Sequence, residues 1–351
     1  MPPDGLVLAP VPGGDSSDRP EGPAARPALR RLPRSGWRVV AAKEFGDGIL
    51  SVRLYILIAL LGLAAVGAIY STASYVGNNA QLASGAIGLF VLLFSHPNPT
   101  SSVPSFATLI GLLGPLLGIA FGFDAINGER SERTLPRLVS QPIHRDAVII
   151  GKFAAGLAVM GVVLLAITLI VSGVAFLVLG VSPSPDDILR LGAWFIVSLA
   201  YLGFWLAFAM LCSVVVRRAA TSALAAIALW IVLTIFSALL VGIVADFLSP
   251  VPASPTTDQQ IANVELRLDL ARISPGTLYS EAAAYLLDPT VQTVDVGAEV
   301  AQQNNNRAIP SVLPLDQSLL LAWPQVTALL AFTCICFGLG YVSFMRQEVR
   351  A

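Results

Sequence analysis

Residues Phe153 to Leu179 read FAAGLAVMGVVLLAITLIVSGVAFLVL and include no charged residue. A helix needs about 20 mostly apolar residues to cross a hydrocarbon core about 30 Å thick. This run is apolar on every side of a helix, so it offers no face to water. The stretch therefore predicts a helix that crosses a membrane, and its extra length predicts a tilted helix or one that projects beyond the bilayer.

Five other stretches meet the same criterion and also lack Asp, Glu, Lys, Arg and His. We therefore predict an all-α integral membrane protein with six transmembrane helices. The apolar run Leu82–Phe94 is too short to span and favours a re-entrant or interfacial segment. The six predicted spans are Leu54–Ala73, Phe106–Phe123, Phe153–Leu179, Leu191–Val216, Ala219–Ala245 and Ser318–Phe344.

The composition excludes several other classes of protein. Of the 351 residues, 55% are hydrophobic and 12% are charged, whereas a soluble domain has about 25% charged residues. The net charge of −1 argues against nucleic-acid binding, which needs a basic excess. The three cysteines, Cys212, Cys334 and Cys336, lie in apolar surroundings and are predicted to be small buried hydrophobes. We predict neither a metal site nor a cofactor.

The basic residues predict the orientation in the membrane. With six spans and a cytoplasmic N-terminus, 17 of the 21 Lys and Arg residues lie on the cytoplasmic side and four lie outside. Cytoplasmic loops of membrane proteins carry such an excess. Both termini are therefore predicted to be cytoplasmic, in a multi-pass protein of the plasma or inner membrane.

The chain divides into a tail and a membrane domain. Residues 1–35 are rich in Pro, Gly and Arg, lack the apolar core of a signal peptide and predict a disordered cytoplasmic tail. Residues 36–351 form the predicted six-helix domain. We expect this domain to begin with an interfacial helix that contacts membrane lipid; the alternative is a plain extension of the first span. The residues assigned to the interfacial helix are Trp37, Lys43, Glu44 and Phe45.

An acidic loop is predicted between the fifth and sixth spans, on the outer side. Within this loop, 246–317, the segment Thr257–Ile273 places apolar residues on one helical face. Ser274 and Pro275 predict the start of a second helix, which runs through Leu287. The acidic charge is typical of a solvated face, and a vestibule that attracts cations is the alternative.

Glycines recur on one face of the second predicted span, at Gly114, Gly118 and Gly122. Such a face allows another helix backbone to approach closely. Pro115 removes a backbone donor and predicts a kink. The partner of this glycine face is either a helix of the same bundle or, alternatively, a moving helix or a second protomer.

The connection from Asp124 to Arg145 reads DAINGERSERTLPRLVSQPIHR. Thr134 can cap a short helix with a proline in its first turn. Leu135 and Leu138 then form a small apolar face, and the helix ends before Pro142. A short capped helix with leucines and arginines, tethered between two spans, favours docking to a cytosolic partner.

This connection resembles the signature loop of ABC-2-type transporter permeases, the membrane subunits of one class of ATP-binding-cassette exporter. The resemblance covers about residues 37–346, and it is greatest to permeases of the copper-processing and nitrous-oxide-reductase maturation type. Arg133 departs from the pattern, because the family usually has Gly before Thr. The matching residues are Asp124, Gly128-Glu129, Thr134-Leu135, Leu138, Ser140-x-Pro142, Arg145 and Gly151-Lys152, with Lys43-Glu44-Phe45 and Ile273-Ser274-Pro275 elsewhere.

The resemblance implies a permease subunit that is driven by a separate cytosolic P-loop ATPase, generally for export. Two copies, or a pair of related permeases, would assemble with two ATPase subunits. In that family the loop is a coupling helix seated in a groove of the ATPase, which corresponds here to Thr134–Ser140. The residues assigned to this coupling loop are Glu129, Arg130, Thr134, Leu135, Leu138, Pro142, Arg145 and Lys152.

Independent features also place the energy source on another chain. The sequence has no G-x-x-x-x-G-K-[ST] phosphate loop, and its predicted spans lack the ionisable groups that proton-coupled carriers use. The chain is therefore predicted not to be an enzyme. Three further classes stay open. One is a sodium-coupled carrier that uses backbone carbonyls, and another is a channel that conducts ions without nucleotide. The third is a non-transporting scaffold or sensor that binds a partner protein through the outer acidic loop.

Overall fold

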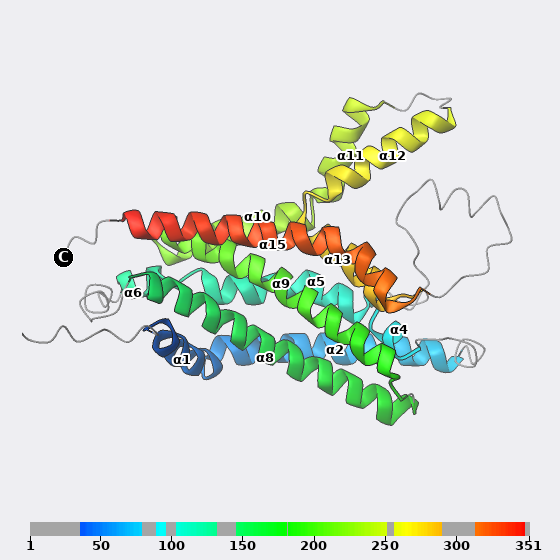
Figure 1. The fold of residues 1–351 in the computed structure, drawn as a ribbon, viewed down its shortest axis with the longest axis horizontal. Helices are drawn as coiled ribbons and strands as arrows, with labels where there is room; N and C mark the ends of the chain where they lie inside the picture. Colours follow the sequence, from blue (N-terminus) through cyan, green and yellow to red (C-terminus); the bar gives the residue numbers. More distant parts are fainter. Residues whose placement is uncertain are drawn as a thin grey trace, which may run out of the picture. The chain divides into compact units, whose positions relative to one another are not determined.

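The computed structural model describes residues 36–78, 89–95, 103–131, 145–180, 182–250, 256–289 and 313–347. Within these ranges every regular element is an α-helix, as the sequence predicts (Figure 1). The predicted tail, 1–35, lies outside the described residues. The helices are α1 (Gly36–Ile49), α2 (Val52–Asn78), α4 (Leu89–Ser95), α5 (Phe106–Gly122), α6 (Asn127–Ser131), α8 (Arg145–Leu179), α9 (Pro185–Val215), α10 (Ala219–Thr234), α11 (Ser237–Leu248), α12 (Thr257–Ala271), α13 (Pro275–Leu287) and α15 (Leu315–Arg346).

Helix α9 is the central element of the unit Ser35–Ala351. It packs against α5, α8, α10, α13 and α15, and Figure 1 shows α5, α8 and α15 running alongside it. Its large side chains Trp194, Tyr201 and Trp205 are fully buried. Ser184 begins the helix with a capping box, in which its side chain and that of Asp187 satisfy each other's backbone N–H groups. A capped helix with apolar residues all round is the natural core of this bundle.

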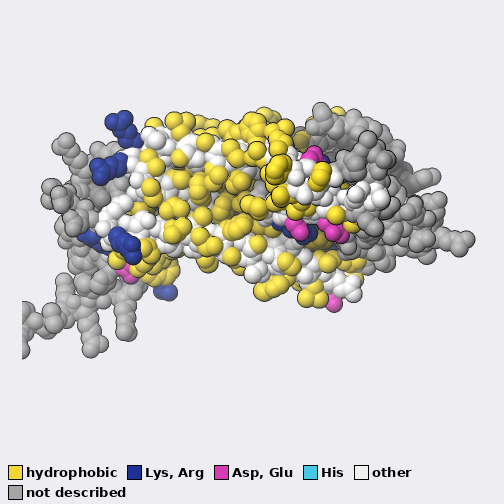
Figure 2. Space-filling view, turned by 90° about the horizontal axis from the view of Figure 1, so that it is seen from above, with side chains coloured by type: hydrophobic (Ala, Val, Ile, Leu, Met, Phe, Trp, Pro, Cys, Tyr) yellow, Lys and Arg dark blue, Asp and Glu magenta, His cyan; other side chains and the backbone are white. Residues whose placement is uncertain are grey.

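The outer helices expose large apolar side chains. Leu63 on α2, Leu169 on α8 and Trp323 on α15 are each more than 60% exposed. Figure 2 shows hydrophobic side chains covering the middle of one face, with Lys and Arg gathered at one end of it. A water-soluble protein rarely exposes apolar area of this extent. The surface is therefore the one expected of helices whose outer sides contact lipid.

Five described helices are long and apolar enough to cross a membrane. They agree with five of the six predicted spans, although the helices extend further at their ends. The fifth predicted span, Ala219–Ala245, is not one continuous helix. The chain forms α10 and α11 there, bent by 55° at a short break, and the total is six spans only if this pair is counted as one.

The break between α10 and α11 is accompanied by a change in hydrogen bonding. The hydroxyl of Ser274 donates to the carbonyl oxygen of Leu233 over 2.8 Å, and this carbonyl would otherwise bond within the helix. The amide of Phe236 instead reaches back to the carbonyl of Ile231. At the far end of α11, the side chain of Asn263 donates to the carbonyl of Ser249 over 2.7 Å. Side chains distant in sequence therefore bond to backbone carbonyls at the end of each half of the predicted span.

The segment between α11 and α15 contains the two predicted helices. α12 and α13 start where the sequence predicts, and α13 ends at Leu287 as expected. Ser274 stands at the N-cap of α13, but its side chain makes no capping bond because it serves Leu233 instead. The short helix α4 buries Phe90 and Phe94 within the protein, and it packs against α5 and α13. Residues 290–312 of the predicted outer loop lie outside the described ranges.

Helix α5 continues through Pro115, and its missing hydrogen bond is replaced from α9. Proline has no N–H, so the carbonyl of Gly111 loses its helical donor. The hydroxyl of Tyr201 donates to that carbonyl over 2.8 Å. An unpaired carbonyl in an apolar environment costs several kcal/mol, so Tyr201 compensates for the proline.

We expect Tyr201→Phe to lower the free energy of unfolding by about 1–3 kcal/mol, because it leaves the Gly111 carbonyl unpaired. Pro115→Ala restores the helical donor, so the same tyrosine change should cost about 1 kcal/mol less in that background. The midpoint of SDS-induced unfolding in mixed micelles measures both effects. Tyr279→Phe is the control, because its hydroxyl bonds Ala107 and its effect should be the same with either residue at 115. Additive effects of Tyr201→Phe and Pro115→Ala would contradict this explanation.

Candidate functional site

The glycine face of α5 packs against α9 of the same chain. A Cβ atom on Gly118 would lie 2.8 Å from the backbone nitrogen of Leu206, and one on Gly122 would lie 2.9 Å from the backbone oxygen of the same leucine. Gly114 faces the side chain of Leu202 at 2.9 Å. In the structure this face thus meets a helix of the same chain. The close approach joins α5 and α9 backbone to backbone.

A second close approach joins α1 to α8. A Cβ atom on Gly151 would lie 2.8 Å from both the carbonyl oxygen of Trp37 and the Cβ of Val40. Val40 is buried, and α1 packs along the start of α8. The first helix is thus held against the protein at the residue directly before Lys152.

Lys152 connects three helices through ion pairs. Its ammonium lies 3.1 Å from Oε1 of Glu44 on α1 and 2.8 Å from Oε1 of Glu129 on α6. The Lys152 side chain is only 8% exposed, and both carboxylates are largely shielded from solvent. Charge-assisted contacts of this kind are short and strong when they are screened from water. We call Glu44, Glu129 and Lys152 the Lys152 cluster.

The cluster borders a groove of about 510 Å³ between α1, α2, α5 and α8. Charged groups of both signs line it. Arg53 pairs with Asp124 across the groove, and its guanidinium also lies 5.1 Å from the centre of the Phe123 ring. Partial burial lowers the pKa of Lys43, but bonds and charges from Asp47 and Glu44 outweigh burial and raise that pKa above its usual value. The groove is therefore tied together by ion pairs on several elements.

Both flanks of the connection between α6 and α8 are anchored to the bundle. On the α6 side, the amides of Ile126 and Asn127 both donate to the hydroxyl of Ser213 on α9 over 3.1 Å. On the α8 side, the guanidinium of Arg145 donates to the carbonyl of Gln347 over 3.2 Å. The side chain of Gln347 in turn donates to the carbonyl of Val214. Anchors on α9 and α15 thus hold the positions where the connection leaves and re-enters the bundle.

The structure brings together some of the residues that the sequence singled out. Glu44, Glu129 and Lys152 meet in one cluster, Arg145 lies at the start of α8, and Arg130 lies in α6. Trp37, Lys43 and Phe45 lie on α1, which is helical as predicted. The central part of the connection, 132–144, lies outside the described residues, and with it Thr134, Leu135, Leu138 and Pro142.

Comparison with known sequence families identifies the family of this chain. The family described as ABC-2 family transporter protein matches residues 38–349, nearly the whole helical unit. The chain belongs to this family. Together with its apolar helices, the match makes it a multi-pass membrane protein. The match begins within α1 and ends after α15, so the Lys152 cluster lies inside it.

Two curated relatives of this ABC-2 family chain carry the name probable ABC transporter permease protein NosY. The chain is 29% identical to the one from Stutzerimonas stutzeri over 197 residues, which cover 54% of this chain and 64% of the relative. It is 31% identical to the one from Pseudomonas aeruginosa over 156 residues, which cover 44% of this chain and 50% of the relative. The chain thus spans between half and two thirds of the length of these relatives, and both belong to the subgroup that the sequence resembles.

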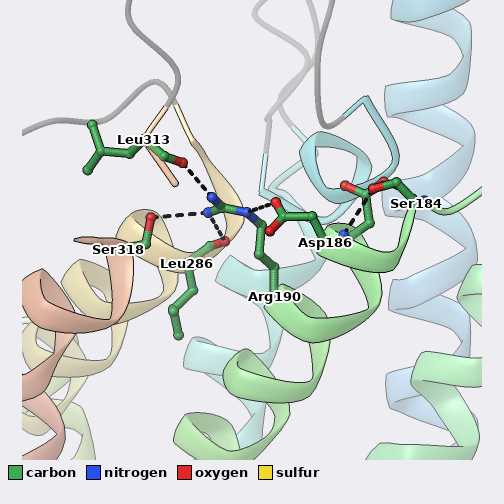
Figure 3. A network of polar contacts seen from close by, with 7 residues as sticks. Ser184, Asp186, Arg190, Leu286, Leu313 and Ser318 are labelled. Carbon is green, nitrogen blue, oxygen red and sulfur yellow. Dashed lines mark hydrogen bonds and ion pairs between the residues drawn. The ribbon is translucent and has the colours of Figure 1, made fainter. Parts of the chain in front are cut away.

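This ABC-2 protein also contains a buried arginine, which is one of the four basic residues predicted to lie on the outer side. Arg190 is 1% exposed and lies at the end of the bundle where α9 begins (Figure 3). It donates to Asp186, to the carbonyls of Leu286 and Leu313, and to the hydroxyl of Ser318. The guanidinium therefore joins α9, the end of α13 and the start of α15. The spacing of Asp186 and Arg190, one helical turn apart just before an apolar run, is a signal that could have found it.

Proposed function

We propose that this chain is the membrane subunit of an ATP-binding-cassette transporter, and that a separate ATPase drives it through the connection between α6 and α8. The observation that carries the proposal is the Lys152 cluster. It links the residues on either side of this connection to each other and to α1. A displacement of the connection is therefore transmitted to three helices at once. The family match and the names of the two relatives support the same conclusion.

The packing supports a mechanism in which helices move as rigid groups. The connection continues from α5 through α6, and α5 is joined to α9 by backbone contacts at Gly118 and Gly122. Packed helices with such contacts shift together rather than slide past one another. A force on the connection would therefore move α5 and α9 as one body. In the complete transporter, that movement would open a path between two membrane subunits alternately to each side.

The remaining parts of the assembly follow from the same proposal. We expect two copies of this chain, or a pair of related permeases, to combine with two ATPase subunits. The connection between α6 and α8 would lie on the cytoplasmic side, where ATP is available. The chain itself lacks a phosphate loop, so its partner would hydrolyse ATP. Export is the direction that we propose.

Replacing Leu135 and Leu138 by Asp should abolish association with the ATPase. The two substitutions put charge on the predicted docking face, and burying those charges in an apolar groove is unfavourable. Tagged full-length protein is purified from its native membranes in mild detergent, and mass spectrometry identifies any P-loop ATPase that is retained. Membrane insertion should stay unchanged.

The chain offers a matched control in Leu29 and Leu32, two leucines with the same spacing in the N-terminal tail. Leu29→Asp with Leu32→Asp should leave the ATPase bound. The proposal fails if the Leu135 and Leu138 variant keeps its ATPase, or if the wild-type chain retains none. Transport by the purified chain alone, in vesicles without nucleotide, would also contradict it.

A further inference from the structure

A second cavity lies at the other end of α5, away from the Lys152 cluster. Its volume is about 520 Å³, and its walls come from the starts of α5 and α13 and from the break between α10 and α11. Tyr279 forms part of its wall. Nothing in the proposed coupling mechanism uses this space.

The walls of this cavity are apolar on one part and carry hydroxyls on another. Ala107, Leu112 and Ala283 are among its apolar lining residues, whereas most of its polar lining residues are Ser or Thr. Among the described residues that line it, none is Lys, Arg or His, and Asp288 is the one acidic residue. A lining of this kind offers hydrogen bonds but no cationic side chain for an anion.

Some of these hydroxyls already have partners within the protein. Ser274 donates to Leu233, Ser280 donates to the carbonyl of Thr277, and Ser105 shares a hydrogen bond with Thr108. The side-chain hydroxyls of Thr234, Ser237 and Thr277 have no hydrogen-bond partner in the described part of the chain. These three hydroxyls come from both sides of the helix break and from the first turn of α13.

The break between α10 and α11 gives a physical reason for hydroxyls without partners in this cavity. Irregular backbone within a membrane helix is tolerated where it is buried in protein or lines a cavity. The residues on either side of this break, Thr234 and Ser237, both line the cavity. Unpaired donors at such a place are stabilised by a bound group that accepts hydrogen bonds.

We propose that this cavity binds an uncharged amphipathic molecule. Its apolar body would lie against the alanine and leucine side chains, and its polar end would accept hydrogen bonds from Thr234, Ser237 and Thr277. An anionic head group would lose its hydration and find no cationic side chain among the described lining residues. This inference goes beyond the proposed function, because binding requires neither an ATPase nor ATP.

Three probes with the same eight-carbon chain test the proposal: n-octanol, octanoate and octylammonium. The purified full-length chain is placed in phosphatidylcholine nanodiscs, and radiolabelled probe is measured by equilibrium dialysis with empty nanodiscs subtracted. We expect saturable binding of n-octanol and none of octanoate, whereas octylammonium, for which Asp288 is the one described counter-ion, should bind more weakly than n-octanol. Thr234→Val, Ser237→Ala and Thr277→Val combined should weaken octanol binding at least tenfold.

The controls separate loss of the site from loss of folding. Thr327→Val with Thr333→Val removes two hydroxyls from α15, outside the cavity lining, and should leave binding unchanged. Ala284→Leu fills the cavity and should abolish binding even if the triple variant unfolds, with Ala331→Leu on α15 as its matched control. Failure of octanol to saturate, equal binding of a charged probe, or wild-type affinity in the folded triple or Ala284→Leu variant would each overturn the proposal.

Discussion

Gly118→Ala should separate α5 from α9 and lower the free energy of unfolding by about 3 kcal/mol. The added methyl group would lie 2.8 Å from the backbone nitrogen of Leu206 and from Cβ of Trp205, and 3.0 Å from the backbone oxygen of Leu202. Two of these atoms belong to backbone, so no side-chain rotation relieves the contact. The helices themselves must move apart. SDS-induced unfolding of the purified chain measures the loss.

Gly67→Ala is the control for this prediction. Gly67 lies within the α2 span, and a Cβ atom there would meet nothing within 4 Å. The change should therefore cause no loss of stability, and the better helix propensity of alanine favours a small gain. Equal unfolding midpoints for the Gly118 and Gly67 variants would show that the α5–α9 contact is not as close as the structure has it.

Arg190→Met should lower the free energy of unfolding by about 3–5 kcal/mol, since two buried carbonyls lose their donor at a cost of about 1–3 kcal/mol each. The substitution keeps apolar volume but removes every donor of the guanidinium. The carbonyls of Leu286 and Leu313 then lose a donor in a buried place, and an unsatisfied buried acceptor costs more than the bond itself contributes. The same unfolding assay in mixed micelles reports the effect.

Asp186→Asn separates the role of the ion pair from that of the carbonyl contacts. Asp186 is 56% exposed, so loss of its charge should cost less than about 1 kcal/mol. Arg190→Lys should behave nearly like Arg190→Met, because one ammonium cannot reproduce the fork that reaches α13 and α15 together. If the Lys variant kept full stability, the positive charge at this position would be sufficient and the several N–H donors of the guanidinium would not be needed.

These two expectations concern two contacts of α9, one near its middle and one near its start. Gly118 joins α5 to α9 along the bundle, and Arg190 joins α9 to α13 and α15 where α9 begins. The Lys152 cluster lies where α8 begins. Under the proposed function, movement that enters at the cluster is carried by α5 and α9 to the far end. Loss of either contact should therefore reduce transport even in variants that still reach the membrane.

The long apolar helices could be predicted from the sequence because their signal is local. A run such as Phe153–Leu179 has no polar face for water and is long enough to cross a bilayer. Five of the six predicted spans coincide with helices that are long and apolar enough to cross a membrane. The starts of α12 and α13 were also predictable, since the apolar period and the Ser274-Pro275 pair are local signals. The choice of Glu44, Glu129 and Lys152 came from resemblance to a family.

The fifth predicted span shows what local sequence patterns do not predict. Its composition is apolar throughout, and the residues at the break include neither Pro nor Gly. At the break, the carbonyl of Leu233 accepts a hydrogen bond from Ser274, which lies 41 positions further along the chain. No window of local sequence contains both residues. Tyr201 and Gly111 are likewise 90 positions apart, so local sequence does not predict their hydrogen bond.

The sequence by itself determined that this protein is helical, that it crosses a membrane several times and that it belongs with ABC-2 transporters, because apolar length and a short signature are properties of adjacent residues. Tertiary structure alone decided which helix the glycine face meets, that one span is broken, and that Arg190 and Lys152 each hold three elements together. Those outcomes depend on donors and acceptors that are far apart in the chain and that meet only when the helices pack.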